Sequence, residues 1–113
     1  MGYMRNHTII VTGWDESAIA AIHDIASAIF PWVSPMSPVV INCARSFFVP
    51  PDGSKEGWDE SVEGDKQRAQ FIAELKKANA TPEDMLDWVE VQYGDDNNEA
   101  RVCDAGDLTP MEW

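Results

Sequence analysis

The stretch that decides the fold is HTIIVTGWDESAIAAIHDIASAIFP, residues 7–31. Its first part, residues 7–14, is an apolar and β-branched run that predicts a buried strand. Asp15 follows as the N-cap of a helix, in which apolar side chains return at helical spacing until Pro31 stops it. His23 lies close to the apolar stripe of this helix, so we expect a histidine at the edge of the core with a satisfied ring nitrogen.

The next part of the chain combines prolines with sheet-forming residues. Three prolines in residues 31–38 (PWVSPMSP) exclude regular structure, so we expect an irregular crossover there. Residues 39–49 (VVINCARSFFV) are rich in β-branched and aromatic side chains and predict either one long strand or two short strands broken near residues 44–46. The sequence PPDGS at residues 50–54 then predicts a turn.

A second helix is predicted from Asp59 or Ser61 to about Asn79, because its apolar residues fall on one face. Arg68 lies near the start of that face, where its stem can pack while the guanidinium group reaches a carboxylate. The residues expected on the apolar face are Phe71, Ile72, Leu75 and Ala78.

The last part of the chain predicts a β-hairpin. Residues 81–84 (TPED) combine an N-cap, a proline and two acids, which predicts one short helical turn. Residues 88–93 and 99–104 then alternate between apolar and polar side chains on either side of the turn sequence GDDNN at 94–98.

Together these elements predict an α+β fold in the order β-α-β-α-β-β. We expect two main helices packed on one face of a small mixed sheet of about four strands. A length of 113 residues suits one domain, which we expect to span residues 1–113. The ordered core is expected at about 7–104, followed by a loose tail at 105–113.

The composition narrows the class of partner. The chain has 20 acidic and 8 basic side chains and a formal net charge of −12 at pH 7, which disfavours direct binding to nucleic acid or to an anionic membrane. No apolar run is long enough to span a membrane, and residues 1–7 show no secretory signal, so we expect a cytoplasmic protein. Cys43 and Cys103 are expected to be buried thiols.

The acidic side chains are unevenly distributed, and two interpretations of this remain open. Residues 51–113 hold 17 of the 20 acids, which gather at 52–65 and 95–99. They either keep the domain soluble or imitate DNA phosphates and occupy the basic nucleic-acid groove of another protein. Trp58, an aromatic residue among these acids, is typical of an interface anchor. The candidate binding residues are Trp58, Asp59, Glu60, Glu63, Asp65, Asp95, Asp96 and Glu99.

Metal binding and catalysis are the remaining classes. Residues 52–63 (DGSKEGWDESVE) match an EF-hand loop in part, with Asp52, Ser54, Glu56, Gly57 and Glu63 at positions 1, 3, 5, 6 and 12. Prolines precede this segment instead of a helix, and Asp59 stands where an aliphatic residue belongs, so we expect a capped turn and no metal. No standard enzyme signature is present, and we expect no catalytic residue and no cofactor; paired carboxylates are the one catalytic alternative.

Three segments carry a resemblance to a known group of proteins. They are FFVPPDGSKEGW at 47–58, the helix residues Asp65, Arg68, Phe71 and Ile72, and DWVEVQYGD at 87–95. In these segments the chain resembles small, uncharacterised acidic proteins encoded by bacteriophages and prophages, and the likeness covers most of residues 7–104. The resemblance implies a cytosolic accessory protein that inhibits a host enzyme, a restriction system or a CRISPR effector.

Taken with the acidic composition, the resemblance implies a phage-encoded acidic binding protein that acts in the host cytoplasm without catalysis. Its expected partner is a host protein with a basic nucleic-acid-binding surface, as for an anti-CRISPR or anti-restriction protein that mimics DNA. A structural, assembly or accessory protein of the phage is the alternative, followed by a small enzyme or a calcium-binding module.

Overall fold

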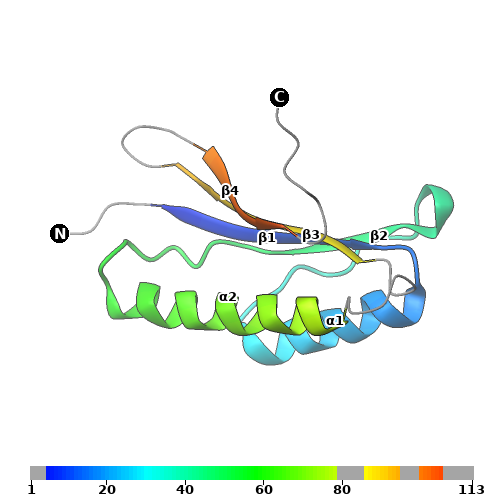
Figure 1. Ribbon diagram of the computed structural model, residues 1–113, viewed down its shortest axis with the longest axis horizontal. Coiled ribbons are helices and arrows are strands. Elements are labelled where there is room, and N and C mark those ends of the chain that lie inside the picture. The colour runs from blue at the N-terminus through cyan, green and yellow to red at the C-terminus, as the bar shows by residue number, and fades with distance from the viewer. Residues whose placement is uncertain (1–4, 79–85, 95–99, 106–113) are drawn as a thin grey trace.

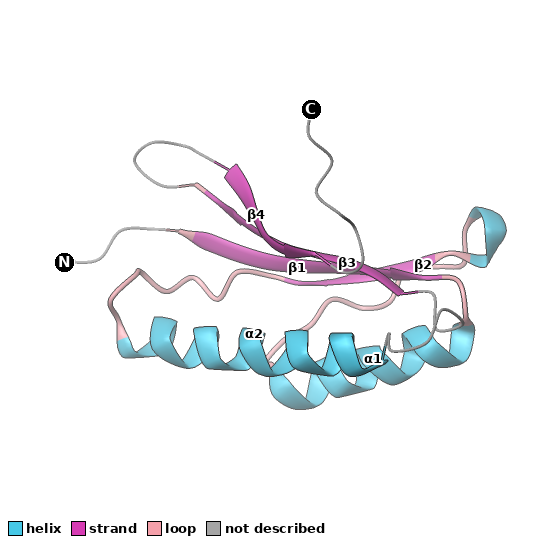
Figure 2. Cartoon of the chain, in the orientation of Figure 1, coloured by secondary structure: helices cyan, strands magenta, loops and turns pink. Residues whose placement is uncertain are grey.

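The computed structural model describes residues 5–78, 86–94 and 100–105 (Figure 1). It confirms the α+β class, with two helices that lie together on one face of a four-stranded sheet (Figure 2). The elements in chain order are β1 (Asn6–Gly13), α1 (Glu16–Ile29), the 3₁₀ turn η1 (Ile41–Cys43), β2 (Arg45–Val49), α2 (Asp59–Ala78), β3 (Leu86–Tyr93) and β4 (Ala100–Ala105).

The sheet has the strand order β2-β1-β3-β4, and neighbouring strands are antiparallel, so the expectation of a mixed sheet was wrong. The reason lies in the connection from α1 to β2. This segment runs back along the sheet before β2 begins, which places Arg45 beside Gly13 and Val49 beside Ile9. The strand β2 therefore starts at the end where β1 finishes, and the two strands run in opposite directions.

Two serines of the proline-rich segment determine this path. The N–H of Ser34 donates to the carbonyl of Phe48 (3.0 Å) and the N–H of Ser37 to that of Ser46 (2.8 Å). The hydroxyl oxygens of Ser34 and Ser37 accept in turn from the N–H groups of Phe48 and Ser46. Residues 34–37 thus pair with the outer edge of β2, although prolines interrupt them, and this pairing covers an otherwise open sheet edge.

Of the one long strand or two short strands predicted over residues 39–49, only a single short strand forms. The segment Ile41–Cys43 is a 3₁₀ turn, and Asn42 and Cys43 both have a positive φ (61° and 62°), so the chain reverses there and only Arg45–Val49 is strand. This turn leaves Cys43 exposed, and Cys103 is exposed on β4, so the expectation of buried thiols was wrong.

The core lies between the helices and one face of the sheet. Asp15 caps α1 as predicted, since its carboxylate accepts from the N–H of Ala18 (3.0 Å). His23 lies at the edge of the core, where its Nε2 is 2.9 Å from the carbonyl oxygen of Ser34. The predicted face of α2 is confirmed, with Ala78 partly buried. The buried apolar residues are Ile9, Val11, Ile19, Ile22, Ala26, Phe30, Phe47, Val49, Phe71, Ile72, Leu75, Leu86 and Trp88.

The described hairpin strands β3 and β4 pair as predicted, with an irregularity between Glu90 and Val91. The helical turn predicted at 81–84, most of the turn at 94–98, and nearly all of the tail lie outside the described residues. None of the helices in the described ranges is long and apolar enough to cross a membrane.

Candidate functional site

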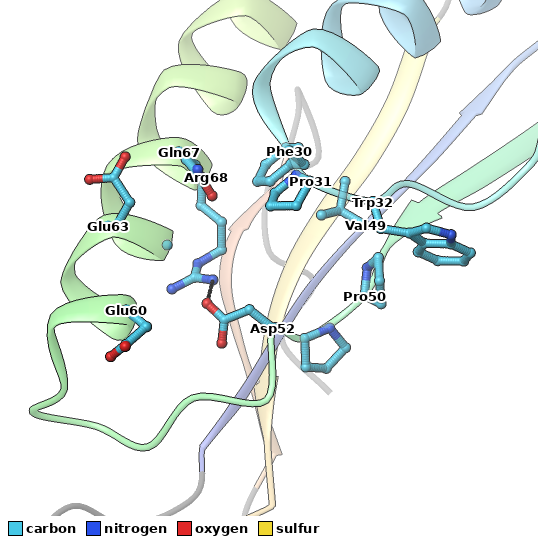
Figure 3. A pocket seen from close by; sticks show the side chains of 12 residues that line it. Phe30, Pro31, Trp32, Val49, Pro50, Asp52, Glu60, Glu63, Gln67 and Arg68 are labelled. Carbon is cyan, nitrogen blue, oxygen red and sulfur yellow. Dashed lines mark ion pairs between the residues drawn. The ribbon is translucent and has the colours of Figure 1, made fainter.

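A cleft of about 470 Å³ opens where α2 begins, between this helix, the end of α1 and the segment that follows β2 (Figure 3). Its volume falls in the range of small-ligand sites, roughly 300–1,000 Å³. One wall is apolar and the other is polar. The apolar wall consists of Phe30, Pro31, Trp32, Val49, Pro50 and Pro51, and the polar wall of Asp52, Glu60, Glu63, Gly64, Gln67 and Arg68.

The apolar wall is built by two proline-containing segments that cannot continue regular structure. Pro31 follows the C-cap of α1, where the N–H of Phe30 still donates to the carbonyl of Ala26 (2.9 Å). Trp32, the next residue, is 57% exposed, and its ring meets that of Phe48 edge-on. Because proline fixes φ, these segments offer a preformed apolar surface to the cleft.

Arg68 lies deep in the polar wall and is only 6% exposed. Its Nη2 lies 2.5 Å from Oδ1 of Asp65, its Nη1 lies 3.9 Å from Oδ2 of Asp52, and its Nε lies 3.9 Å from Oε2 of Glu90. The predicted contact of this guanidinium group with a carboxylate is therefore confirmed. Three carboxylates surround one cation, so the surroundings of Arg68 carry net negative charge.

Gly64 allows the loop after β2 to approach α2 this closely. A β-carbon at Gly64 would overlap Oδ2 of Asp52 and lie 3.1 Å from Nη1 of Arg68. Inside a helix glycine costs about 1 kcal/mol relative to alanine. Close approach of the Asp52 carboxylate is the physical reason for a glycine here, and the sequence alone did not reveal it.

The two carboxyl groups near Arg68 have pKa values shifted in opposite directions. Burial raises the pKa of Asp52, but hydrogen bonds from the hydroxyl and N–H of Ser54 (2.6 and 2.9 Å), together with Arg68, outweigh it, and the pKa is lowered. Burial raises the pKa of Glu90, and the attraction of Arg68 and His7 does not reverse this. Asp52 therefore remains ionised over a wider pH range than Glu90.

The structure brings some of the predicted site residues together and separates others. Glu60 and Glu63 line the cleft, and Asp65 contributes through Arg68. Asp59 and Trp58 are exposed nearby without lining it, and Trp58 lies beside Lys55, whose Nζ is 5.9 Å from the ring centroid. The remaining predicted residues, Asp95, Asp96 and Glu99, lie outside the described residues.

The segment proposed as a partial EF-hand directs its carboxylates to other partners. Asp52 accepts from Ser54 and faces Arg68, while Oε1 of Glu56 lies 3.0 Å from Nε2 of His7. In the described ranges, no group of three or more His, Cys, Asp or Glu side chains is placed to hold a metal ion.

Sequence reasoning missed the apolar wall of the cleft. Phe30, Trp32 and Pro50 belong to segments that only the folded chain brings together. The available signal was a proline directly after each of two apolar elements, which indicates a rigid exit from the core but not that the two exits face each other.

No family model, curated protein or solved structure matches this chain. The fold and the cleft therefore define the protein only as a small acidic α+β protein with a cleft that is apolar on one side and anionic on the other.

Proposed function

We propose that the chain is a non-catalytic binding protein that docks onto the basic nucleic-acid-binding surface of a host protein. The observation that supports this is uncompensated charge at the start of α2. In the described part of the chain, Asp59, Glu60 and Glu63 are exposed and form no ion pair, and we call these three residues the acidic surface. The neighbouring acids Glu56 and Asp65 each contact a cationic or ionisable partner.

Helix stability explains only part of the acidic surface. Asp59 and Glu60 lie in the first turn of α2, where negative charge favours the helix dipole. Glu63 lies in the second turn, where this effect has fallen off. A cluster of exposed like charges steers a protein toward an oppositely charged partner and raises the association rate.

The phage context is part of the same proposal. Its support is the resemblance of residues 47–58 and 87–95 to phage-encoded proteins, together with the net charge of −12. In that context the target is a restriction enzyme or a CRISPR effector, whose DNA-binding or RNA-binding groove is basic.

A second candidate function, a structural or assembly protein of the phage, is supported by the face of the sheet away from the helices. Ile10, Phe48 and Tyr93 line a shallow hollow there and are 39–43% exposed, and Val102 on β4 is 61% exposed. An exposed apolar patch of this kind is typical of a protein contact. Association through this face would depend little on salt.

Capture of the tagged protein from a host lysate, with a salt-gradient elution, tests the proposal. We expect a nucleic-acid-binding partner that elutes at moderate salt and is displaced by duplex DNA, because screening weakens contacts between exposed charges. The double variant Glu60→Gln/Glu63→Gln should lose retention, while the control Asp24→Asn/Asp87→Asn, which removes the same charge from exposed positions elsewhere, should keep it. Equal retention of both variants would reject the acidic surface.

A further inference from the structure

We propose that the face of the sheet away from the helices binds a second copy of this chain, so that two sheets pack face to face in a symmetric dimer. Figure 2 shows α1 and α2 on one side of the sheet, and no helix or strand of the described residues covers the other side, which we call the open face. Register gives its side chains. Ile10 of β1 lies between Phe48 of β2 and Val89 of β3, and Val91 lies beside Val102 of β4.

The charged side chains of the strands point away from the open face. Arg45, Glu90 and Asp104 each lie near an oppositely charged residue of α1 or α2, so they occupy the helix side of the sheet. On the open face the described strands place one charged side chain, Asp87, which lies beside Thr12 at one end of β3. An antiparallel sheet with a solvated face normally turns polar side chains toward water. The apolar character of the open face therefore indicates a protein contact.

The near absence of charge on this face defines the occupant. A charged side chain held against it would lose hydration without gaining a partner, which is costly. The occupant must therefore be flat, apolar and almost free of charge, and a second open face has all three properties. Each chain has a net charge of −12, and packing through the open faces keeps the two helix layers, with their acids, on the outside of the dimer.

The relief of the open face is complementary to itself. A shallow hollow of about 630 Å³ lies beside Ile10 and Phe48 on β1 and β2, whereas Val102 on β4 is 61% exposed. The strand order is β2-β1-β3-β4, so a two-fold axis parallel to the strands, between β1 and β3, places β4 of each copy over β2 of the other. Val102 of each copy then faces the hollow of the other, as a closed two-fold interface requires.

The area of the open face predicts a reversible dimer. Its strands have five to eight residues. With about 4.8 Å between strands and about 3.3 Å per residue, they cover roughly 20 by 20 Å, or about 400 Å² per copy before side-chain relief is counted. Trp32 is 57% exposed and meets Phe48 edge-on, so it extends the apolar area beyond β2. The two copies together approach about 1,000 Å², where specific interfaces begin, and we expect a dissociation constant in the micromolar range.

Sedimentation velocity of the full chain over a concentration series tests the dimer. We expect the mass to double as the concentration rises through the micromolar range. The dissociation constant should stay the same or fall as NaCl rises from about 50 to about 300 mM, because salt screens the repulsion between two acidic chains. A protein that stays monomeric up to about 1 mM, or a dimer that salt weakens, would overturn the proposal.

Two valine variants locate the interface. Val102→Glu places a carboxylate on the open face and should raise the dissociation constant about tenfold or more, because that carboxylate loses its hydration in the dimer. Val62→Glu adds the same charge at a 51% exposed valine of α2 and should leave the dissociation constant unchanged. Thermal unfolding checks that both variants are folded. If Val62→Glu weakens the dimer as much as Val102→Glu, the open face is not the interface.

Methyl NMR identifies the occupant of the open face. In a mixture of ¹³C-labelled and unlabelled full-length copies, isotope-filtered NOEs should join the methyl groups of Val102 to the ring of Phe48 on another copy. The methyl signals of Ile10 and Val102 should also shift on dilution, whereas those of Val62 should not. Contacts of Ile10 with residues 106–113 of its own chain, unchanged by dilution, would show that the face is covered within one chain and would reject the dimer.

The dimer and the proposed function can fail separately, because the acidic surface lies on α2, on the helix side of the sheet (Figure 1). The variant Glu60→Gln/Glu63→Gln should therefore dimerise at least as well as wild type. If the dimer forms but the lysate yields no nucleic-acid-binding partner, the dimer stands and the proposed function fails. If such a partner is retained by a protein that stays monomeric, the proposed function stands and the dimer fails.

Discussion

The carboxylate of Asp52 lies directly against Gly64 of α2, so close that a β-carbon on Gly64 would overlap its Oδ2. This contact joins the loop after β2 to the helix and brings Asp52 to within 3.9 Å of Arg68. We expect Gly64→Ala to give none of the gain of about 1 kcal/mol that alanine normally brings to a helix interior. The carboxylate must turn away instead, and its contact with Arg68 is lost.

A double-mutant cycle checks this relationship. In an Asp52→Ala background the overlapping oxygen is gone and only the end of the Arg68 side chain, 3.1 Å from the β-carbon position, has to adjust. Gly64→Ala should then raise the free energy of unfolding by up to about 1 kcal/mol. Urea denaturation of the wild type, both single variants and the double variant measures the coupling. Additive effects of the two substitutions would show that the contact has no energetic role.

Arg68 provides a second prediction, because it is the buried cation among Asp52, Asp65 and Glu90. Loss of one partner of a buried ion pair costs about 3–5 kcal/mol. The side chains of Asp52 and Asp65 are 41% and 58% exposed, so we expect about 2–3 kcal/mol for Arg68→Ala, below the range for fully buried pairs.

The matched control for Arg68 is Lys77, a cation on the same helix with a 79% exposed side chain that lies 4.0 Å from Glu74. Lys77→Ala should change the free energy of unfolding by less than about 0.5 kcal/mol. Guanidinium chloride would screen these charges, so urea is the denaturant of choice. If both variants lose the same free energy of unfolding, Arg68 does not stabilise the fold through the carboxylates around it.

The exposed cysteines give a third prediction. Both thiols should react with a disulfide reagent in the folded protein, which buried thiols would not do. Cys103 is exposed but partly shielded from solvent, and this partial burial, together with the nearby Glu90, raises the pKa of its thiol against the opposite effect of Arg101 and Arg5. Cys103 should therefore react more slowly than Cys43 at neutral pH. The variant Cys103→Ser identifies the phase, since it should abolish the slower one. If Cys103→Ser removes the faster phase instead, the assignment is wrong.

Local patterns were sufficient to predict most of the secondary structure. The β-branched run of β1, the capping residue Asp15 and the one-sided spacing of Phe71, Ile72 and Leu75 act over a few residues, so they can be read directly from the sequence. The antiparallel start of β2 could not be read in this way, because it depends on hydrogen bonds that Ser34 and Ser37 form with residues 14 and 9 positions further along the chain.

The candidate site was predictable only in its charged half. Acids at Glu60 and Glu63 stand out in the sequence, and their surface position follows from the helix. The apolar half depends on Trp32 and Pro50, which only the folded chain brings to one cleft. Trp58, an aromatic residue among acids, was the stronger signal in the sequence, but in the structure it is exposed and lies outside the cleft.

The last prediction concerns pH, because Glu90 and Asp52 contribute with opposite signs. Burial raises the pKa of Glu90 above its ordinary value of 4.5. A carboxyl group whose pKa is raised on folding stabilises the folded state as long as it is protonated. This contribution is complete below the ordinary pKa and is lost as the pH rises through the folded-state pKa. Glu90→Gln removes the titration, so the stability of the variant relative to wild type should increase as the pH rises from about 4 to about 7.

Asp52 should show the reverse dependence. Its pKa lies below the ordinary value of 3.8, so its contribution is present above 3.8 and is lost as the pH falls through the folded pKa. The advantage of wild type over Asp52→Asn should therefore be constant near neutral pH and shrink in acid. Urea denaturation at a series of pH values measures both differences. A stability difference for Glu90→Gln that does not change with pH would contradict the raised pKa, and an Asp52→Asn difference that grows in acid would contradict the lowered one.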